Sequence, residues 1–239
     1  MMVTHDLLRA FPLLSPLSES DLDLLAEKSS AKKYARREIV LNARERGEVV
    51  CFLFEGRLQG VDFTIDGREV GLYFIEPKDF CGELLLFDEQ TQPEFIIALT
   101  KAVVVEIPIK ILQAIMLKNS SVMGELGKRL AARVRQMTYQ RSLLGLPNIG
   151  QRVCCQLWLL LTSREEGEAE KLAQHVVEIL NPPTHMEIAI MLNLSRETVT
   201  RVFQTLQNRQ IVRRAGATTL IVENPALLKQ FADGSEELG

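Results

Sequence analysis

Four side chains between residues 196 and 201 would share one face of a helix. Arg196, Glu197, Thr200 and Arg201 stand at positions i, i+1, i+4 and i+5. An arginine can donate two parallel hydrogen bonds to guanine O6 and N7, and a glutamate can accept one from the cytosine amino group. This set therefore has the chemistry needed to read base edges in the major groove of DNA.

Residues 183–207 predict two helices and a tight turn that would position these side chains. Asn193 tolerates the left-handed backbone of the turn, and Ser195 is a good N-cap for the second helix. The inward-facing residues are Ile188, Leu192, Leu194, Val199, Val202 and Leu206, with small Ala189 at the helix crossing. The pattern fits a helix-turn-helix at its inward, small, turn and cap positions. The alternative is an ordinary helical hairpin with a charged surface, which would not require those positions.

Both helix starts carry groups that suit DNA phosphates. Ser195 and Thr198 place hydroxyls at the start of the second helix, where free backbone amides also favour an anion. Thr184 and His185 begin the first helix, and we expect phosphate contacts from them as well. Residues 211–214 and 218–222 then predict a two-stranded wing.

The net charge of −3 argues weakly against a nucleic-acid partner, but the charge is unevenly distributed. Residues 1–120 hold 14 basic and 19 acidic groups, whereas residues 121–239 hold 14 basic and 12 acidic groups. Between residues 196 and 214 there are five arginines and one acid. A polyanion partner such as double-stranded DNA is therefore expected in the second half of the chain.

Length and composition indicate an ordinary globular protein. The 239 residues predict one large domain or two small ones, and no run of 18 apolar residues suggests a membrane span. No secretory signal is visible at the N-terminus. The four cysteines, Cys51, Cys81, Cys154 and Cys155, are interpreted as small buried hydrophobes in a reducing, cytoplasmic compartment, with a redox pair at Cys51 and Cys81 as the alternative.

Short apolar runs alternate with turn residues over residues 34–108. The run 49–54 ends at a glycine, Asp66-Gly67 is a strong hairpin signal, and the run 103–107 ends at Pro108. Many short strands at even spacing predict a small antiparallel barrel or jelly roll.

A long helix is predicted after residue 119, with an apolar seam that could pair two copies of the chain. The seam residues are Met123, Leu126, Leu130, Val134 and Met137. Their spacing of three and four is typical of a coiled coil, so a homodimer is expected. The alternative is that the seam packs on the chain's own barrel. Gly145 and Pro147 break the helix, which predicts three parts: 1–117, 118–145 and 146–239. The acidic run at 164–168 is expected to be a solvated loop.

The segment Ser195-Arg196-Glu197-Thr198-Val199-Thr200-Arg201 resembles the recognition helix of the CRP/FNR family of bacterial transcription regulators. The resemblance extends over nearly the whole chain. It implies an α+β fold with an N-terminal antiparallel β-roll like a cyclic-nucleotide-binding domain, a long dimerisation helix and a C-terminal winged helix-turn-helix. It also implies that Arg196, Glu197 and Arg201 read bases. Arginine at 196 is typical of the cyclic-AMP receptor branch of the family. A palindrome with TGTGA-like half-sites and an RNA polymerase partner are expected on the same ground.

The motif Gly82-Glu83-Leu84 resembles the phosphate-binding cassette of the same family. There the glutamate binds the ribose, and an arginine and a serine about eleven residues later hold the cyclic phosphate. Pro93 and Glu94 stand at those two positions here, and no lysine or arginine lies between residues 78 and 101. A phosphate would meet a carboxylate and no cation, so cyclic AMP is not expected to be the effector.

Residues of the long helix would complete this pocket. Met137 and Thr138 stand where the family contacts the purine, and only Thr138 fits the family's usual hydroxyl residue. Arg133 or Arg129 could supply the missing cation, which leaves a cyclic dinucleotide or another small molecule open as effector.

Enzymatic and metal-dependent functions find little support. Residues 34–108 contain no histidine, and neither a Walker A loop nor a G-x-S-x-G motif occurs. The three histidines are poor haem ligands, and the cysteine spacing does not suit an iron–sulfur cluster. We therefore expect no catalytic residues, no metal and no cofactor; a cupin-type small-molecule enzyme is the alternative from a different class.

Overall fold

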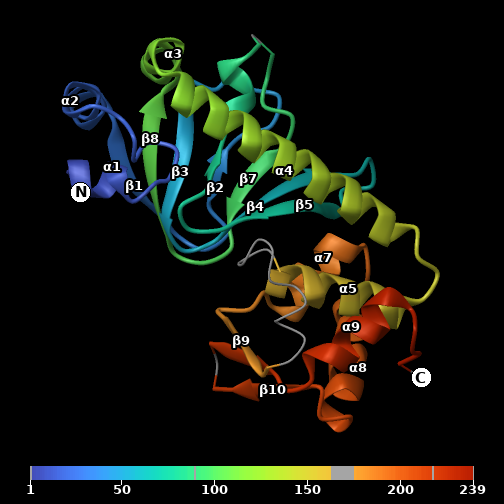
Figure 1. Ribbon diagram of the computed structural model, residues 1–239. Helices are drawn as coiled ribbons and strands as arrows, with labels where there is room; N and C mark the ends of the chain where they lie inside the picture. The colour runs from blue at the N-terminus through green and yellow to red at the C-terminus, as the bar shows by residue number, and fades with distance from the viewer. Residues whose placement is uncertain (1, 89, 163–174, 217, 239) are drawn as a thin grey trace. The chain divides into compact units, whose positions relative to one another are not determined.

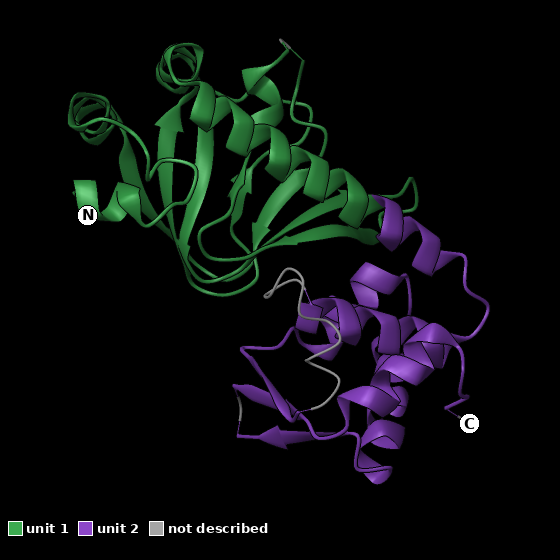
Figure 2. Cartoon of the chain, viewed as in Figure 1, with its two compact units in different colours: residues 1–137 green, residues 138–239 purple. Residues whose placement is uncertain are grey.

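The computed structural model describes residues 2–238 apart from residues 89, 163–174 and 217. The chain divides into two compact units, residues 1–137 and 138–239, and the boundary lies within a long helix (Figure 2). The acidic run at 164–168 lies outside the described residues.

The first unit begins with two helices that pack on a sheet. α1 (His5–Arg9) and α2 (Glu19–Lys28) have Thr4 and Ser18 as N-caps, whose hydroxyls accept hydrogen bonds from backbone amides of the first turn. Their leucines share one core with α3 (Ile109–Lys118) and with Phe52, whose ring meets Phe11 edge-on at 5.2 Å. These helices thus cover one face of the roll.

Two four-stranded antiparallel sheets form the body of the first unit (Figure 1). One has the strand order β1 (Ser30–Tyr34), β8 (Ala102–Pro108), β3 (Val49–Glu55), β6 (Phe80–Cys81). The other has the order β2 (Ile39–Leu41), β7 (Phe95–Ala98), β4 (Leu58–Phe63), β5 (Glu69–Ile75). The antiparallel roll predicted from the sequence is confirmed.

Local sequence explains the turns that shape the roll. Gly67 has φ 78°, and it joins β4 to β5 so that Phe63 pairs with Glu69, as the Asp-Gly signal predicted. Gly82 has φ 82° just before the 3₁₀ helix η1 (Glu83–Leu86). A Cβ on Gly82 would lie 3.1 Å from the Val49 carbonyl oxygen, so the turn needs glycine for space as well as conformation. Cys51 and Cys81 are buried and lie opposite each other on β3 and β6.

The long helix α4 (Ser120–Leu144) packs one of its faces on the chain's own roll. Leu126 is fully buried in the core of the first unit, and Leu130 packs against that core. The expectation that Leu126 lies in a dimer seam is therefore wrong, whereas half-buried Leu130 stays a predicted seam residue. Met123, Val134 and Met137 remain 36%, 64% and 42% exposed. The predicted 3.5-residue repeat had placed Leu126, which faces the roll, in one stripe with residues of the neighbouring, exposed face of the helix.

The second unit combines helices with a small sheet. Besides the end of α4, its described residues form the helices α5 (Ile149–Thr162), α7 (His185–Leu192), α8 (Arg196–Asn208) and α9 (Pro225–Asp233). Its antiparallel sheet has the order β10 (Val212–Ala215), β11 (Thr219–Val222), β9 (Val177–Leu180). The two-stranded wing was predicted, but the third strand, β9, was not. Cys154 and Cys155 are buried in α5, where burial raises the pKa of the Cys154 thiol to about 12.

Candidate functional site

The turn between α7 and α8 is fixed by local hydrogen bonds. Thr184 and Glu187 form a reciprocal capping box at the start of α7, with 3.3 Å from Glu187 N to Thr184 Oγ1 and 2.9 Å from Thr184 N to Glu187 Oε2. Asn193 ends α7 with φ 51° and ψ 48°, the left-handed conformation expected for this turn. The Leu194 amide donates to the Ala189 carbonyl at 2.9 Å. The entry angle of α8 is thereby set.

The start of α8 is capped by Ser195. Its hydroxyl accepts a hydrogen bond from the Thr198 amide at 3.1 Å and lies 2.9 Å from Thr198 Oγ1. Val199, Phe203 and Leu206 form the buried face of the helix. Val202, which was expected in that face, is only half-buried, and Phe203 takes the inward position.

The opposite face of α8 is exposed and charged. Arg196, Glu197 and Arg201 are all exposed, and Thr200 lies half-buried beside them. Backbone amide donation at the helix start and a hydrogen bond from Ser195 hold the pKa of Glu197 below its usual range. This carboxylate is therefore an acceptor at neutral pH. The four side chains predicted to read bases do lie together on one face.

Two other predicted phosphate contacts are partly engaged within the protein. The Thr184 hydroxyl is used in the capping box. His185 Nδ1 lies 2.9 Å from Thr200 Oγ1, and its Nε2 is buried without a hydrogen-bond partner. Both ring nitrogens of His185 thus face the protein interior: Nδ1 meets Thr200, and Nε2 is buried.

The wing adds two further cations. Arg213 donates from Nε to Glu223 Oε1 at 2.7 Å, whereas Arg214 on the same strand is exposed. Strand β10 thus carries positive charge next in sequence to α8.

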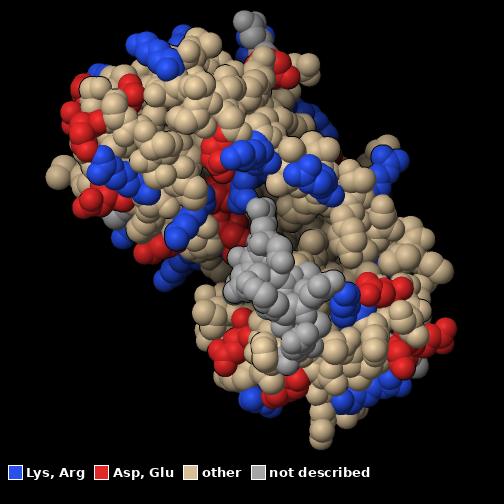
Figure 3. All heavy atoms as spheres, in the orientation of Figure 1, with Lys and Arg blue, Asp and Glu red and all other residues tan. Residues whose placement is uncertain are grey.

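A buried ion-pair network occupies the roll where the cassette motif lies. Arg133 of α4 reaches Glu83 at 2.5 Å (Nη1 to Oε1) and Asp79 at 3.3 Å (Nη2 to Oδ1), and it donates to the Phe80 carbonyl at 2.7 Å. Its guanidinium lies 4.9 Å from the centre of the Tyr73 ring. Acidic and basic side chains meet on the face of the first unit that α4 crosses (Figure 3). Arg133 was predicted as a rescuing cation, and here it neutralises the chain's own carboxylates.

Glu94 lies in the same region and is also buried. The Tyr73 hydroxyl donates a hydrogen bond to Glu94 Oε1. Desolvation raises the pKa of Glu94 above its usual range, and the nearby Glu83 acts in the same direction. A buried carboxyl thus stands at the position that the family resemblance assigns to a phosphate-binding hydroxyl.

The remaining predicted pocket residues do not gather around this network. Met137 and Thr138 lie at least one helical turn beyond Arg133 along α4 and are exposed. Leu84 is 41% exposed. Glu83 does lie at the network, because it pairs with Arg133, and Gly82 precedes it as the N-cap of η1.

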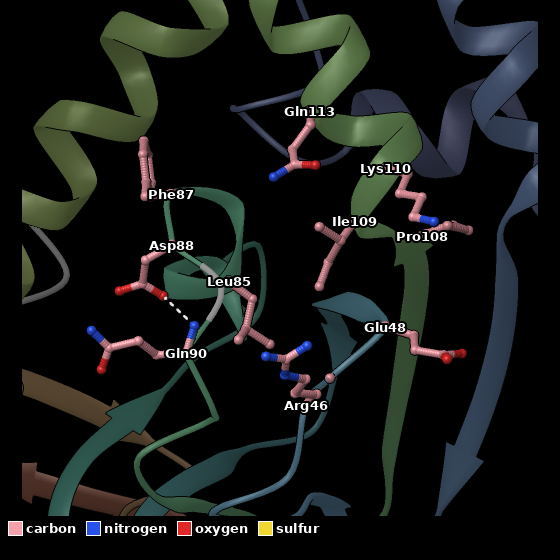
Figure 4. Close-up of a pocket in the computed structure, with 11 residues that line it drawn as sticks. Arg46, Glu48, Leu85, Phe87, Asp88, Gln90, Pro108, Ile109, Lys110 and Gln113 are labelled. Carbon is pink, nitrogen blue, oxygen red and sulfur yellow. Dashed lines mark hydrogen bonds between the residues drawn. The ribbon is translucent and has the colours of Figure 1, made fainter.

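A separate pocket of about 700 Å³ lies beside η1 and the start of α3 (Figure 4). Arg46 and Lys110 bring positive charge to its wall, Glu48 and Asp88 bring negative charge, and Leu85 and Ile109 add apolar surface. It shares no residue with the Arg133 network. The sequence offered no signal for it, because its walls come from three separate segments.

Within the described residues, no group of three or more histidine, cysteine or acidic side chains is placed to hold a metal ion. No helix in the described part of the chain has the length and hydropathy of a membrane span.

Two family models match the chain. The model of the cyclic nucleotide-binding domain matches residues 31–119, and that of the Crp-like helix-turn-helix domain matches residues 151–231.

Similar proteins cover nearly the same length. The cAMP-activated global transcriptional regulator CRP of Pasteurella multocida is 25% identical over 208 residues, which cover 87% of this chain and 97% of that protein. The cAMP-activated global transcriptional regulator Vfr of Pseudomonas aeruginosa is 26% identical over 204 residues, covering 84% and 92%. The structure of FixK2 from Bradyrhizobium japonicum superposes with a TM-score of 0.71 at 20% identity, covering 85% of this chain and 96% of FixK2.

Proposed function

Because the chain belongs to the CRP/FNR family of transcription regulators, we propose that it binds a palindrome with TGTGA-like half-sites as a homodimer, without a requirement for cyclic AMP. Its family consists of DNA-binding regulators rather than enzymes. The observation that carries the proposal is the exposed face of α8, where Arg196, Glu197 and Arg201 stand on a capped and buried scaffold.

In this proposal the side chains of α8 divide into two groups. Arg196 and Arg201 donate to guanine edges, and Glu197 accepts from a cytosine amino group. Ser195 and Thr198 at the helix start meet the phosphate backbone, where the helix N-terminus also favours an anion. Thr184 adds backbone contact at the start of α7. Phosphate contacts fix the register, and the base contacts supply the specificity.

A stripe along α4 supports a second copy of the chain as partner. It runs through Met123, Gly127, Ala131, Val134 and Met137 at spacings of four, four, three and three. A Cβ on Gly127 would meet no atom within 4 Å, so this side of the helix is open. Small residues at 127 and 131 would let two helices approach closely. Pairing there would join two recognition helices on the two halves of a palindrome.

Independence from cyclic AMP rests on the interior of the roll. A cyclic phosphate near Glu94 would meet a buried carboxyl, and the nearest α4 cation, Arg133, already neutralises Glu83 and Asp79. Withdrawing Arg133 from those acids would leave Glu83 without its cation in a desolvated site, and Asp79 with Arg129 alone. Cyclic-nucleotide binding is therefore costly here.

By family resemblance, RNA polymerase is the expected protein partner. A small-molecule effector other than cyclic AMP, such as a cyclic dinucleotide, is the alternative to ligand independence. Of the two α4 arginines that bind Asp79, Arg129 is the more accessible to an effector, since its side chain is 44% exposed against 10% for Arg133. Calorimetric titration with cyclic AMP and with cyclic di-GMP distinguishes a protein without a nucleotide effector from one that binds a cyclic dinucleotide. Heat of binding from the dinucleotide alone would favour the alternative.

The test is a fluorescence-anisotropy titration of a duplex with two TGTGA half-sites one helical turn apart, against the same duplex with scrambled half-sites. We expect preference for the palindrome, a steep loss of affinity with salt, and equal affinity with and without cyclic AMP. Lack of binding at low salt in every ligand state would refute the regulator proposal. Binding only in the presence of cyclic AMP would refute the ligand independence.

A further inference from the structure

His185 connects the two helices of the helix-turn-helix through its side chain. It is the first residue of α7, and its Nδ1 lies 2.9 Å from Thr200 Oγ1 in the middle of α8. Its ring also lies against Phe203, with ring centroids 4.4 Å apart. A residue of the first helix is therefore in polar and apolar contact with the recognition helix.

The hydrogen-bond directions assign the tautomer of His185. The Thr200 hydroxyl donates its single hydrogen to the Arg196 carbonyl at 2.9 Å. Its oxygen must then accept from His185, so Nδ1 carries the hydrogen and Nε2 carries a lone pair. Nε2 is buried and has no hydrogen-bond partner.

The surroundings keep this imidazole neutral. Burial lowers the pKa of His185, and the charges of Arg214 on β10 and Arg196 on α8 lower it further. The carboxylate of Glu187, on His185's own helix, is engaged in the capping box. A proton on Nε2 would create a buried cation whose N–H has no acceptor.

We infer that His185 is a positioning residue for sequence recognition. As a neutral Nδ1–H donor it holds the Thr200 hydroxyl, which holds the Arg196 carbonyl, so that the first turn of α8 keeps one orientation. This inference rests on the proposed function, because its readout is DNA binding. It replaces the phosphate contact that the sequence suggested for His185.

The test compares five proteins on the TGTGA palindrome: wild type, His185→Ala, His185→Asn, Thr200→Val and the double variant His185→Ala/Thr200→Val. An asparagine amide can donate from near the Nδ1 position, whereas alanine cannot, and Thr200→Val removes the acceptor with little change of shape. We expect His185→Ala and Thr200→Val each to lose roughly 3- to 10-fold in affinity, the double variant to lose little more, and His185→Asn to retain most of it.

Salt dependence separates positioning from phosphate contact. A positioning residue leaves the slope of log K against log salt unchanged when it is removed, whereas loss of a phosphate contact lowers the slope by about 1. Because His185 stays neutral, lowering the pH from 7.5 to 6 should not raise the DNA affinity of the wild type through protonation of this residue. A reduced slope in His185→Ala, or additive losses in the double variant, would overturn the inference.

One measurement needs neither DNA nor a variant. The ¹⁵N shifts of the His185 ring at neutral pH in the intact protein should show a protonated Nδ1 and an unprotonated Nε2. The reverse tautomer would overturn the inference even if every variant misfolded. Failure of wild type to bind the palindrome would instead count against the proposed function, since the tautomer is measured without DNA.

Discussion

Arg133 on α4 and Glu83 at the start of η1 form an ion pair at 2.5 Å, with side chains only 10% and 4% exposed. The pair joins the long helix to the cassette turn without any ligand. Asp79 and the Phe80 carbonyl bind the same guanidinium, so Nη1 and Nη2 both donate to groups of the chain itself. The buried charges are therefore balanced by residues of the protein alone.

Arg133→Met should destabilise the first unit strongly. Breaking a buried ion pair from one side leaves uncompensated charge, and such changes cost about 3–5 kcal/mol. Urea unfolding of the full chain measures the loss. The matched control is Arg129→Met, because Arg129 also bonds Asp79, at 3.0 Å, but is 44% exposed; about 0–1 kcal/mol is expected there. Equal losses in the two variants would contradict this account.

Glu94→Gln should change how stability depends on pH. The pKa of Glu94 is raised in the folded protein, so above its ordinary value of 4.5 the folded state binds more protons than the unfolded state. Stability from this group therefore falls as pH rises from 4.5 through the folded pKa. The variant should lose that contribution to the slope and be at least as stable as wild type at pH 7.5. Unfolding curves at pH 5 and pH 7.5 test it, and an unchanged difference between the two would count against a buried carboxyl.

Arg201→Ala should weaken DNA binding and relax its specificity. Loss of an arginine bidentate to guanine costs about 1–3 kcal/mol and removes the preference at one base pair. Anisotropy titrations against duplexes changed at single half-site positions report both effects. Lys229→Ala removes one positive charge from α9, near the Trp158 ring, and should leave the preference intact. A uniform loss over all sequences would indicate that Arg201 contacts phosphate instead.

Val134→Glu should oppose dimer formation. Val134 is 64% exposed on the α4 stripe, and pairing two helices there would bury two like charges. Sedimentation velocity should show a shift to monomer, and palindrome affinity should fall with it. Lys128→Glu introduces the same carboxylate on the same helix but outside the stripe, and should remain dimeric. A dimeric Val134→Glu protein would place the interface elsewhere.

Local chemistry made most of the second unit predictable. Asn193 in the turn, Ser195 at the cap and the buried Val199 and Leu206 act within a few residues of one another, so sequence spacing sufficed to place them. Val202 and Phe203 could not be ordered in the same way. Both are apolar neighbours, and the choice between them depends on what the helix packs against.

The long-range features escaped prediction because they depend on elements far apart in sequence. Arg133 and Glu83 are separated by 50 residues, so no spacing rule shows that they meet. Leu126 fits the spacing of a dimer seam, and only its burial against the roll shows that it belongs to the core of the first unit. The strand β9 has only four residues, too few to show a strand pattern in the sequence, and its pairing with β11 is what identifies it.

All four cysteines are buried, two in each compact unit. A thiol reagent can therefore react only when the surrounding structure opens, and the sulfur that it marks tells which unit opened. Brief alkylation followed by peptide mass analysis would report the opening of the roll at Cys51 and Cys81 and that of the DNA-reading unit at Cys154 and Cys155. The native cysteines therefore report the unfolding of each unit separately, and no label has to be engineered into the chain.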